Sequence, residues 1–356
     1  GNAASSFLSG QSSKAPNKKQ YEATSPAVRD GTLRHMAAFT WKDLGDDEGC
    51  SFRLGDTILE EASVLFALAQ VLLQKAKSEP LSEHSMLDVF KWLKQASGVL
   101  AHALDTIKEA GAPLDHTPDD LKNGLLGVLV DCSLAQAQHI TIRRAQATMH
   151  ANPAITHALI AKIAHDTAER YKSMETLARG LCGDRAGRAS GRVGAYVMAH
   201  LRFKQLYFAA LAYAMVGIDR VTSDPANLGY GLRDLLTAKE LLSKAELAAK
   251  AFVEAARVIV FVDNLAILHA LNDSMAALDD ILDRARKEND SVYFKAVPEK
   301  AGVLPERMSN LSPDAFEPVP THPAWTPAMI ECFDPNKVPA LHLGKVPESV
   351  DCCPQS

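Results

Sequence analysis

The sequence predicts a mostly α-helical protein, an elongated bundle or solenoid of long antiparallel helices with at most a small β element, for three reasons. From about Asp56, apolar residues recur at spacings of three and four, the period of a helix with one buried face. Proline is absent between residues 225 and 298. Eleven of the 18 prolines lie instead in 298–356, so we expect an extended final segment that is draped over the helices or free.

Composition and charge favour a cytoplasmic protein. At 356 residues and 47% hydrophobic, the chain can bury a large core. Its formal charge is −5 and no long run of Lys and Arg occurs, so we expect no nucleic-acid partner. Six cysteines without Cys-x-x-Cys spacing favour a reduced compartment. No apolar run approaches the roughly 18 residues of a membrane span, so we expect any membrane contact to be made from outside the bilayer.

The texture of the chain divides it into three parts. Residues 1–30 are rich in Ser, Ala, Asn and Lys and are expected to form a flexible segment. A single helical domain is expected over 31–335, followed by a flexible tail over 336–356. Near the start of the domain, Phe39-Thr40-Trp41 is apolar enough to be a strand or a tie to the helical body.

The first two helices are marked by apolar stripes and by breaks. The stripe of the first helix consists of Leu59, Ala62, Leu65, Phe66, Ala69 and Leu73. Glu79-Pro80 breaks it, and Ser82 is expected to cap the second helix. Gly111-Ala112-Pro113 ends that helix.

The most distinctive stretch, Asp131–Ala145, lies in a proline-free run from Asp119 to Asn152. Thr117 is suited to cap this helix, and Pro118 fits its first position. Apolar residues line two of its sides, so neighbours should wrap it rather than cover one face. The sequence therefore predicts a central core helix.

Three further helical regions follow. Asn152-Pro153 is expected to cap the next helix, and a Gly/Arg-rich break over 179–192 should end it. Another helix is expected over about Val193–Val216. A further helical region should start after Gly229 and Gly231, with a β-branched interruption at 258–260.

No motif in the sequence favours an enzyme, a cofactor or a metal site. No P-loop, G-x-S-x-G or H-E-x-x-H occurs. His157 and His165 are eight residues apart, which is not a metal-ligand spacing. Four arginines in the Gly/Arg-rich break would suit a phosphate, but Gly, Ser and Arg are also ordinary chemistry for a solvated helix connection.

The last four residues, Cys353-Pro-Gln-Ser356, have the arrangement of a prenylation box, and a terminal Ser favours a farnesyl group on Cys353. Pro354 and Gln355 stand where aliphatic residues are usual. One lipid chain supports only reversible attachment, so a second anchor is expected: a palmitoyl group on Cys352 or a myristoyl group on Gly1. Gly1 fits a cloning remnant equally well.

Several motifs in order resemble the BRO1 domain family, which includes ALIX. Leu134-Ala-Gln-Ala-Gln138, followed by His139–Ala145, is similar to the central helix of that family. Other similar motifs are Phe39–Lys42, Ile155–Tyr171, Leu206–Gly217, Glu288–Phe294, Phe316–Pro320 and Trp325–Pro327. The resemblance covers about residues 35–335 and implies a boomerang-shaped helical domain.

The resemblance also implies a non-enzymatic adaptor. BRO1 domains bind the amphipathic C-terminal helix of ESCRT-III subunits, the charged multivesicular body proteins, in a concave apolar patch. By alignment, this partner-binding patch falls on Val197 and Leu201, with Met174 and Asp115 as further candidates. Short members of the family end in a prenylated tail, which supports the box at Cys353. The resemblance thus implies a monomer held peripherally on endosomal or other membranes.

Two other hypotheses stay open. The domain would equally serve as a helical scaffold for a different peptide, without a role in ESCRT assembly. An enzyme or signalling protein would use Arg185 and Arg188 of the Gly/Arg-rich break as an anion site. Ordinary helix packing would also explain Val197 and Leu201 without any partner.

Overall fold

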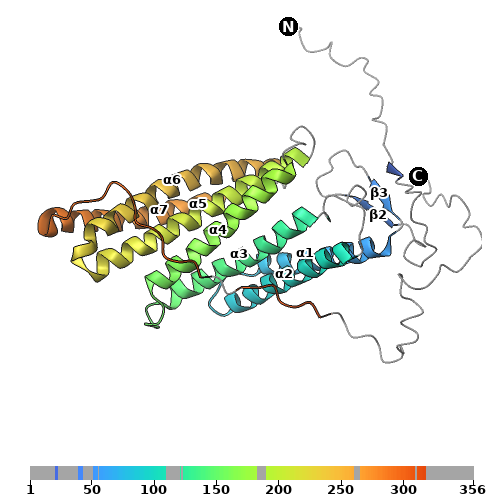
Figure 1. Cartoon of the computed structure of the whole chain (residues 1–356), viewed down its shortest axis with the longest axis horizontal. Helices are drawn as coiled ribbons and strands as arrows, with labels where there is room; N and C mark the ends of the chain where they lie inside the picture. The colour runs from blue at the N-terminus through green and yellow to red at the C-terminus, as the bar shows by residue number, and fades with distance from the viewer. Residues whose placement is uncertain are drawn as a thin grey trace, which may run out of the picture.

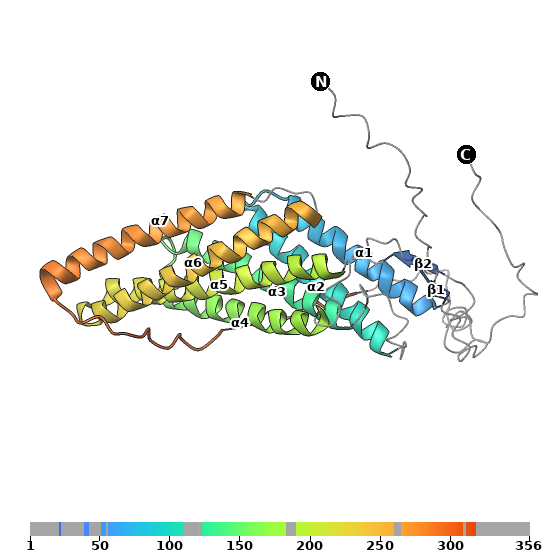
Figure 2. The same cartoon turned by 90° about the horizontal axis from the view of Figure 1, so that it is seen from above.

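The protein is an elongated bundle of long helices that pack side by side in chain order (Figures 1 and 2). The computed structural model describes residues 21–22, 39–42, 51–54, 56–109, 121, 123–182, 190–259, 265–308 and 311–317. Within these ranges the α-helices are α1 (Thr57–Ser78), α2 (Ser85–Glu109), α3 (Asn123–Thr148), α4 (His157–Cys182), α5 (Ser190–Ser223), α6 (Leu228–Ile259) and α7 (Leu265–Glu288). The predicted mostly helical, elongated fold is confirmed.

A small sheet precedes the helices. It consists of β1 (Tyr21–Glu22), β2 (Phe39–Lys42) and β3 (Ser51–Leu54), in the order β1-β3-β2. β2 runs antiparallel to β3 with Phe39 opposite Leu54, and β1 runs parallel to β3. The strand expected at Phe39-Thr40-Trp41 is therefore present.

α1 and α2 form the first pair. The predicted stripe of α1 is buried at Leu59, Ala62, Leu65 and Ala69, in one cluster with apolar residues of α2 and α3. The Asp56 carboxylate caps α1 by accepting from the Ile58 N–H at 3.0 Å. The expected role of Ser82 also holds, because its hydroxyl accepts from the Ser85 N–H at 3.2 Å.

α3 lies between α2 and α4, as its two apolar sides predicted. Its residues belong to three apolar clusters. Leu126 packs with α1 and α2, and Ala137 packs with the C-terminal end of α1 and the N-terminal half of α2. Ile142 packs with α4 and α5. By length and composition, α1 and Gly124–Thr148 are apolar enough to cross a membrane, which was not expected from the absence of a long apolar run. A packed core helix passes the same test, and α3 is one.

The start of α4 differs from the prediction. The Thr156 hydroxyl, not Asn152, caps the helix by accepting from the Leu159 N–H at 3.1 Å. The Asn152 side chain instead accepts from the Ala154 N–H at 3.0 Å and closes a turn ahead of the helix. Asn152-Pro153 therefore belongs to the loop between α3 and α4, and α4 begins about one turn later than predicted.

The Gly/Arg-rich break is narrower than expected. α4 continues to Cys182 and α5 already begins at Ser190, so only 183–189 lie outside the described residues. Gly229 and Gly231, expected ahead of a helix, lie inside α6. A Cβ at Gly229 would lie 2.2 Å from the Ala296 carbonyl oxygen, and one at Gly231 would lie 2.6 Å from Val221. Both glycines therefore permit close packing rather than a turn.

The chain after α7 returns along the bundle as an extended segment, here named the C-terminal strap (residues 294–308 and 311–317; Figures 1 and 2). Its hydrogen bonds connect distant helices. The Gly302 N–H donates to Asp234 of α6 at 3.2 Å, and the Asp314 N–H donates to the Lys94 carbonyl of α2 at 3.4 Å. Between them, the His165 ring of α4 lies 2.9 Å from the Pro305 carbonyl. Of the two expected arrangements of the Pro-rich segment, draped over the helices or free, these residues show the first.

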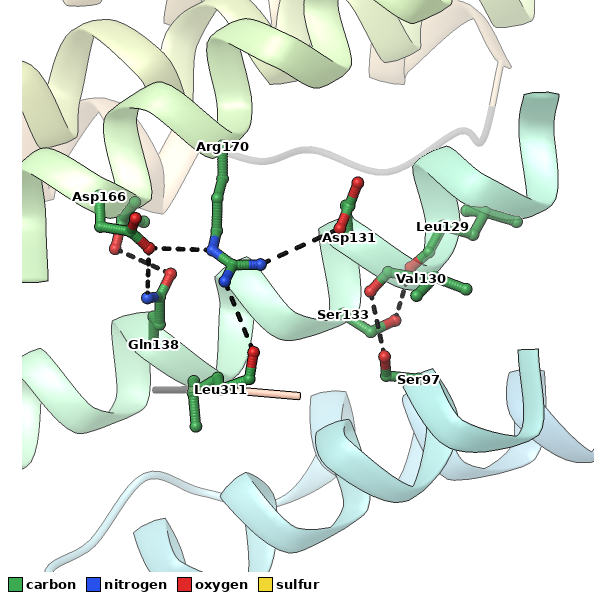
Figure 3. A network of polar contacts seen from close by, with 10 residues as sticks. Ser97, Leu129, Val130, Asp131, Ser133, Gln138, Asp166, Arg170 and Leu311 are labelled. Carbon is green, nitrogen blue, oxygen red and sulfur yellow. Dashed lines mark hydrogen bonds and ion pairs between the residues drawn. The ribbon is translucent and has the colours of Figure 1, made fainter. Parts of the chain in front are cut away.

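A buried polar network joins α3, α4 and the strap (Figure 3). The Gln138 amide donates to the Asp166 carboxylate at 2.8 Å, and Arg170 donates to the same carboxylate at 2.9 Å. Arg170 also reaches Asp131 of α3 at 4.0 Å and the Leu311 carbonyl of the strap at 3.5 Å. Because Gln138 and Asp166 are buried, each needs its partner, and the network fixes the register of α4 on α3.

Candidate functional site

One face of α5 is half buried along much of its length. This α5 stripe consists of Val197, His200, Lys204, Tyr207 and Leu211, at alternating spacings of three and four residues. Such spacing places the five side chains on one side of a helix over about 21 Å. None of the five is fully covered, whereas Leu201, Phe203, Leu206, Phe208 and Ala210 beside them are buried. Part of each of these five side chains therefore remains accessible, although Val197 also packs on the core and His200 packs against Tyr171 of α4 and Phe252 of α6.

The C-terminal half of the stripe forms one wall of a groove of about 490 Å³ between α3, α5 and α7. The groove is lined by His139, Ile142, Arg143 and Gln146 of α3, Phe203, Lys204, Tyr207 and Leu211 of α5, and Ala266, Ile267, Ala270, Leu271 and Ser274 of α7. Ala266 and Ala270 are exposed small residues, so the α7 wall leaves room beside it. A mainly apolar groove bordered by long helices suits the apolar face of another helix.

Two basic side chains, Lys204 and Arg143, lie in the groove. The Lys204 Nζ lies 5.4 Å from the centre of the Phe203 ring. Burial lowers the pKa of Lys204 to about 8; the Cys132 thiol of α3 acts in the opposite direction, and the Arg143 charge lowers the pKa further. Within the described part of the chain, no carboxylate lines the groove and neither cation makes an ion pair. The groove therefore carries positive charge without a matching acid among these residues.

The two histidines beside Lys204 are neutral at physiological pH. Burial, reinforced by the charges of Lys204 and Arg143, lowers the pKa of His139 to about 3. Burial together with Lys204 lowers the pKa of His200 to about 3 as well. Their rings pack on aromatic side chains: His139 against Phe208 at 5.1 Å and His200 against Phe252 at 5.0 Å. They therefore act as packing groups and add no charge to the groove.

The structure separates the residues expected in the binding patch. Val197 lies on the α5 stripe, two turns ahead of Lys204, and is half buried. Leu201 and Met174 are 1% and 0% exposed, within one core cluster of α3, α4 and α5. In this conformation they support α5 from beneath and present no surface to a partner. The helical register explains this placement, because Leu201 points about 40° beyond the stripe, toward α4.

Other expected site residues lie outside the described residues. These are Asp115, Cys352, Cys353 and Gly1, together with Arg185 and Arg188 of the Gly/Arg-rich break. Among the described residues, no group of three or more His, Cys, Asp and Glu side chains is arranged to hold a metal ion.

The sequence did not predict Lys204, Arg143, Tyr207 or the α7 wall of the groove. The regular spacing from Val197 to Leu211 was a visible signal for the α5 part. The His and Lys in that pattern made it resemble the edge of an apolar face. No local signal indicated that α7, about 60 residues further along, would complete the groove.

The bundle and its groove define a helical scaffold domain built around a 34-residue helix. Residues 27–323 match the model of the BRO1-like domain, and the chain belongs to that family. The predicted family is thereby confirmed.

Two relatives extend the comparison. The human (Homo sapiens) BRO1 domain-containing protein BROX is 28% identical over 325 residues, which are 88% of this chain and 74% of that protein. BROX from Danio rerio is 26% identical over 319 residues, 86% of this chain and 72% of that protein.

Solved structures show the same fold. A complex described as ALIX BRO1 with CHMP4C superposes with a TM-score of 0.61 at 21% identity, covering 79% of this chain and 71% of that one. A structure described as the basis for endosomal targeting by the Bro1 domain has a TM-score of 0.59 at 15% identity, covering 78% of this chain and 69% of that one. At such identities the comparison establishes the fold alone.

Proposed function

We propose that the protein is a non-enzymatic, monomeric adaptor that binds the amphipathic C-terminal helix of ESCRT-III subunits along the α5 stripe. The half-buried face from Val197 to Leu211 carries this proposal. Its length of about 21 Å matches about four turns of a docked helix. Apolar anchors at spacings of three and four on the partner would meet stripe residues at the same spacings.

The relatives support the choice of partner. The solved structure of ALIX BRO1 contains CHMP4C, an ESCRT-III subunit, and has the same fold. The proposal transfers that class of partner to this chain and assigns the contact to Val197, Tyr207, Leu211 and Ile267. Leu201 and Met174 hold the floor of the stripe in place.

The number of apolar anchors that the groove accepts sets the expected affinity. Three or four apolar anchors at about 1–2 kcal/mol each, after the costs of association, give a micromolar dissociation constant. Such an affinity suits a partner presented many times on a membrane-bound polymer. There, a lipid anchor on the adaptor raises the effective concentration of each site.

Filling the groove tests the binding site. Ala270 is exposed on the α7 wall, so Ala270→Trp should leave the bundle folded and occupy the space that a docked helix needs. We expect at least a tenfold loss of affinity for ESCRT-III tail peptides by isothermal titration. Ala276→Trp is the matched control, because Ala276 is also exposed on α7 but lies outside the groove. Equal affinities for the two variants would remove the groove from the proposal.

Screening the full set of ESCRT-III tail peptides separates the partner from the site. Binding of one or more peptides by the wild type supports the ESCRT role. If none binds while another amphipathic helix does, the domain is a scaffold for a different partner.

Membrane attachment is proposed through a farnesyl group on Cys353, with Cys352 or Gly1 as the second anchor. The sequence of the prenylation box supports this, together with its presence in the short members of the family. Cys353→Ser should release the protein from endosomal or other membranes in fractionated eukaryotic cells. An intact mass that lacks a lipid on the wild-type protein would contradict the anchor without affecting the groove.

A further inference from the structure

The most informative feature that apolar docking leaves unexplained is the pair of cations in the groove. Lys204 lies in the middle of the α5 stripe, with Val197 and His200 on one side and Tyr207 and Leu211 on the other. A lysine in the centre of an apolar contact would remain buried without compensation if an apolar helix covered it. A partner that covers Lys204 must therefore supply a group that compensates its positive charge.

Arg143 adds a second positive charge to the same groove. Its exposed side chain lines the groove from α3, and the two positive charges repel one another. The polar groups that line the groove beside them are neutral: the histidine His139, the amide of Gln146 and the hydroxyls of Tyr207 and Ser274. Of the described residues that line the groove, none carries a negative charge. Two cations with neutral surroundings select an anion.

We infer that Lys204 and Arg143 form a subsite for a carboxylate side chain that a docked amphipathic helix presents within its apolar face. This inference rests on the proposed function and specifies its partner further. The helix should carry Glu or Asp at an interior anchor position, with apolar anchors about one turn before and after it.

A central acid would also set the register of the complex. Apolar anchors alone permit the helix to slide by a turn along the stripe, because each contact resembles the next. One ion pair at Lys204 is formed in a single register, as a buried polar residue does in a coiled coil. The subsite therefore determines which segment of an acidic amphipathic tail is bound.

The test uses the full chain and the ESCRT-III tail peptide that binds it most tightly. Each Asp and Glu of the peptide is replaced singly by Asn or Gln, and affinities are measured for the wild type and for Lys204→Met. One acidic position should cost the wild type tenfold or more and the variant less than twofold, which defines a coupled pair. Lys244→Met, at an exposed lysine of α6, should retain the full wild-type preference.

Arg143 has a neighbouring control. Arg143→Gln should reduce the preference for the same acidic position, whereas Arg144→Gln should not, because Arg144 is exposed but does not line the groove. The preference should also decline as the pH rises through about 8, the pKa at which half of the Lys204 side chains of the free protein have lost their proton; Cys132 and Arg143 of α3 are the other titratable groups that act on it.

The possible failures are distinguishable. If peptides bind but no acidic position is coupled to Lys204, the subsite is wrong and the apolar groove stands. If no tail peptide binds the wild type, the proposed function fails and the subsite fails with it. If Lys204→Met unfolds cooperatively on heating, as the wild type does, then its lost preference for the acidic peptide position does not come from lost structure.

Discussion

Replacing Gly98 with alanine should destabilise the protein, although Gly→Ala inside a helix is normally stabilising. Gly98 is buried in α2 beneath the C-terminal strap. A Cβ there would lie 1.8 Å from the Asp314 carbonyl oxygen, whereas ordinary contact begins at 3.4 Å. This oxygen belongs to the backbone, so no side-chain rotation relieves the clash. The strap must therefore move away from α2.

The contacts of the strap set the size of the effect. Moving residues 311–317 weakens the Lys94–Asp314 ion pair of 2.6 Å, which is partly exposed and contributes about 0.5 kcal/mol. It also weakens the Asp314–Lys94 backbone hydrogen bond, at about 0.5–1 kcal/mol, and the stacking of Phe316 on His102, at about 1 kcal/mol. The gain in helix propensity offsets about 0.5–1 kcal/mol of this loss. We expect a net destabilisation of about 1–2 kcal/mol.

Urea unfolding of the full chain measures the change, with Gly127→Ala as the matched control. Gly127 lies inside α3, and a Cβ there meets nothing within 4 Å. This control should be more stable than the wild type by about 0.5–1 kcal/mol. If Gly98→Ala is as stable as Gly127→Ala, the strap does not hold α2 as described.

Three other predictions concern α5 and its neighbours. Leu201→Asp should lower the free energy of unfolding by about 3–5 kcal/mol or prevent folding, because it places a charge in a buried cluster; native-like thermal unfolding would contradict this. Lys204→Met should stabilise the protein at pH 7 by on the order of 2 kcal/mol, because a folded pKa of about 8 lies below the ordinary 10.5. For the same reason, the wild type should gain stability between pH 8 and 10.5 and the variant should gain less, as measured by urea unfolding. With a folded pKa of about 3 against 6.5, His200 makes the unfolded state bind more protons, so stability should fall as the pH drops from 6.5 toward 3. His200→Asn should reduce that slope by up to about 1.4 kcal/mol per pH unit, whereas the exposed-site variant His150→Gln serves as the control.

Much of the helical architecture could be predicted because it depends on local periodicity. The stripe from Leu59 to Ala69 is repeated in the buried face of α1. The two apolar sides around Leu126 and Ile142 correspond to neighbours on both sides of α3. Here each side chain faces the direction that its position in the helix dictates, so spacing is sufficient evidence.

The failures occur where distant parts of the chain meet. Gly229 indicated a helix start, yet its role is to admit the Ala296 carbonyl of the strap. Leu201 stays a predicted binding residue, and in this structure the turn of about 100° per residue places it in the core cluster rather than on the α5 stripe. The position of α7 over α5 completes the groove, and no property of either helix alone reveals it.

The length of α5 has a consequence for how the domain recognises a partner. Phe203, Leu206 and Ala210 belong to the cluster shared with α6 and α7, while Leu201, Phe208 and Ala212 belong to the cluster shared with α3 and α4. One continuous helix thus serves both cores and offers no hinge between them over its 34 residues. The α5 stripe is therefore a rigid binding surface whose backbone loses little conformational entropy on binding. Most of the ordering must occur in the partner, and any rearrangement of the domain should proceed by helices sliding along α5 rather than by bending.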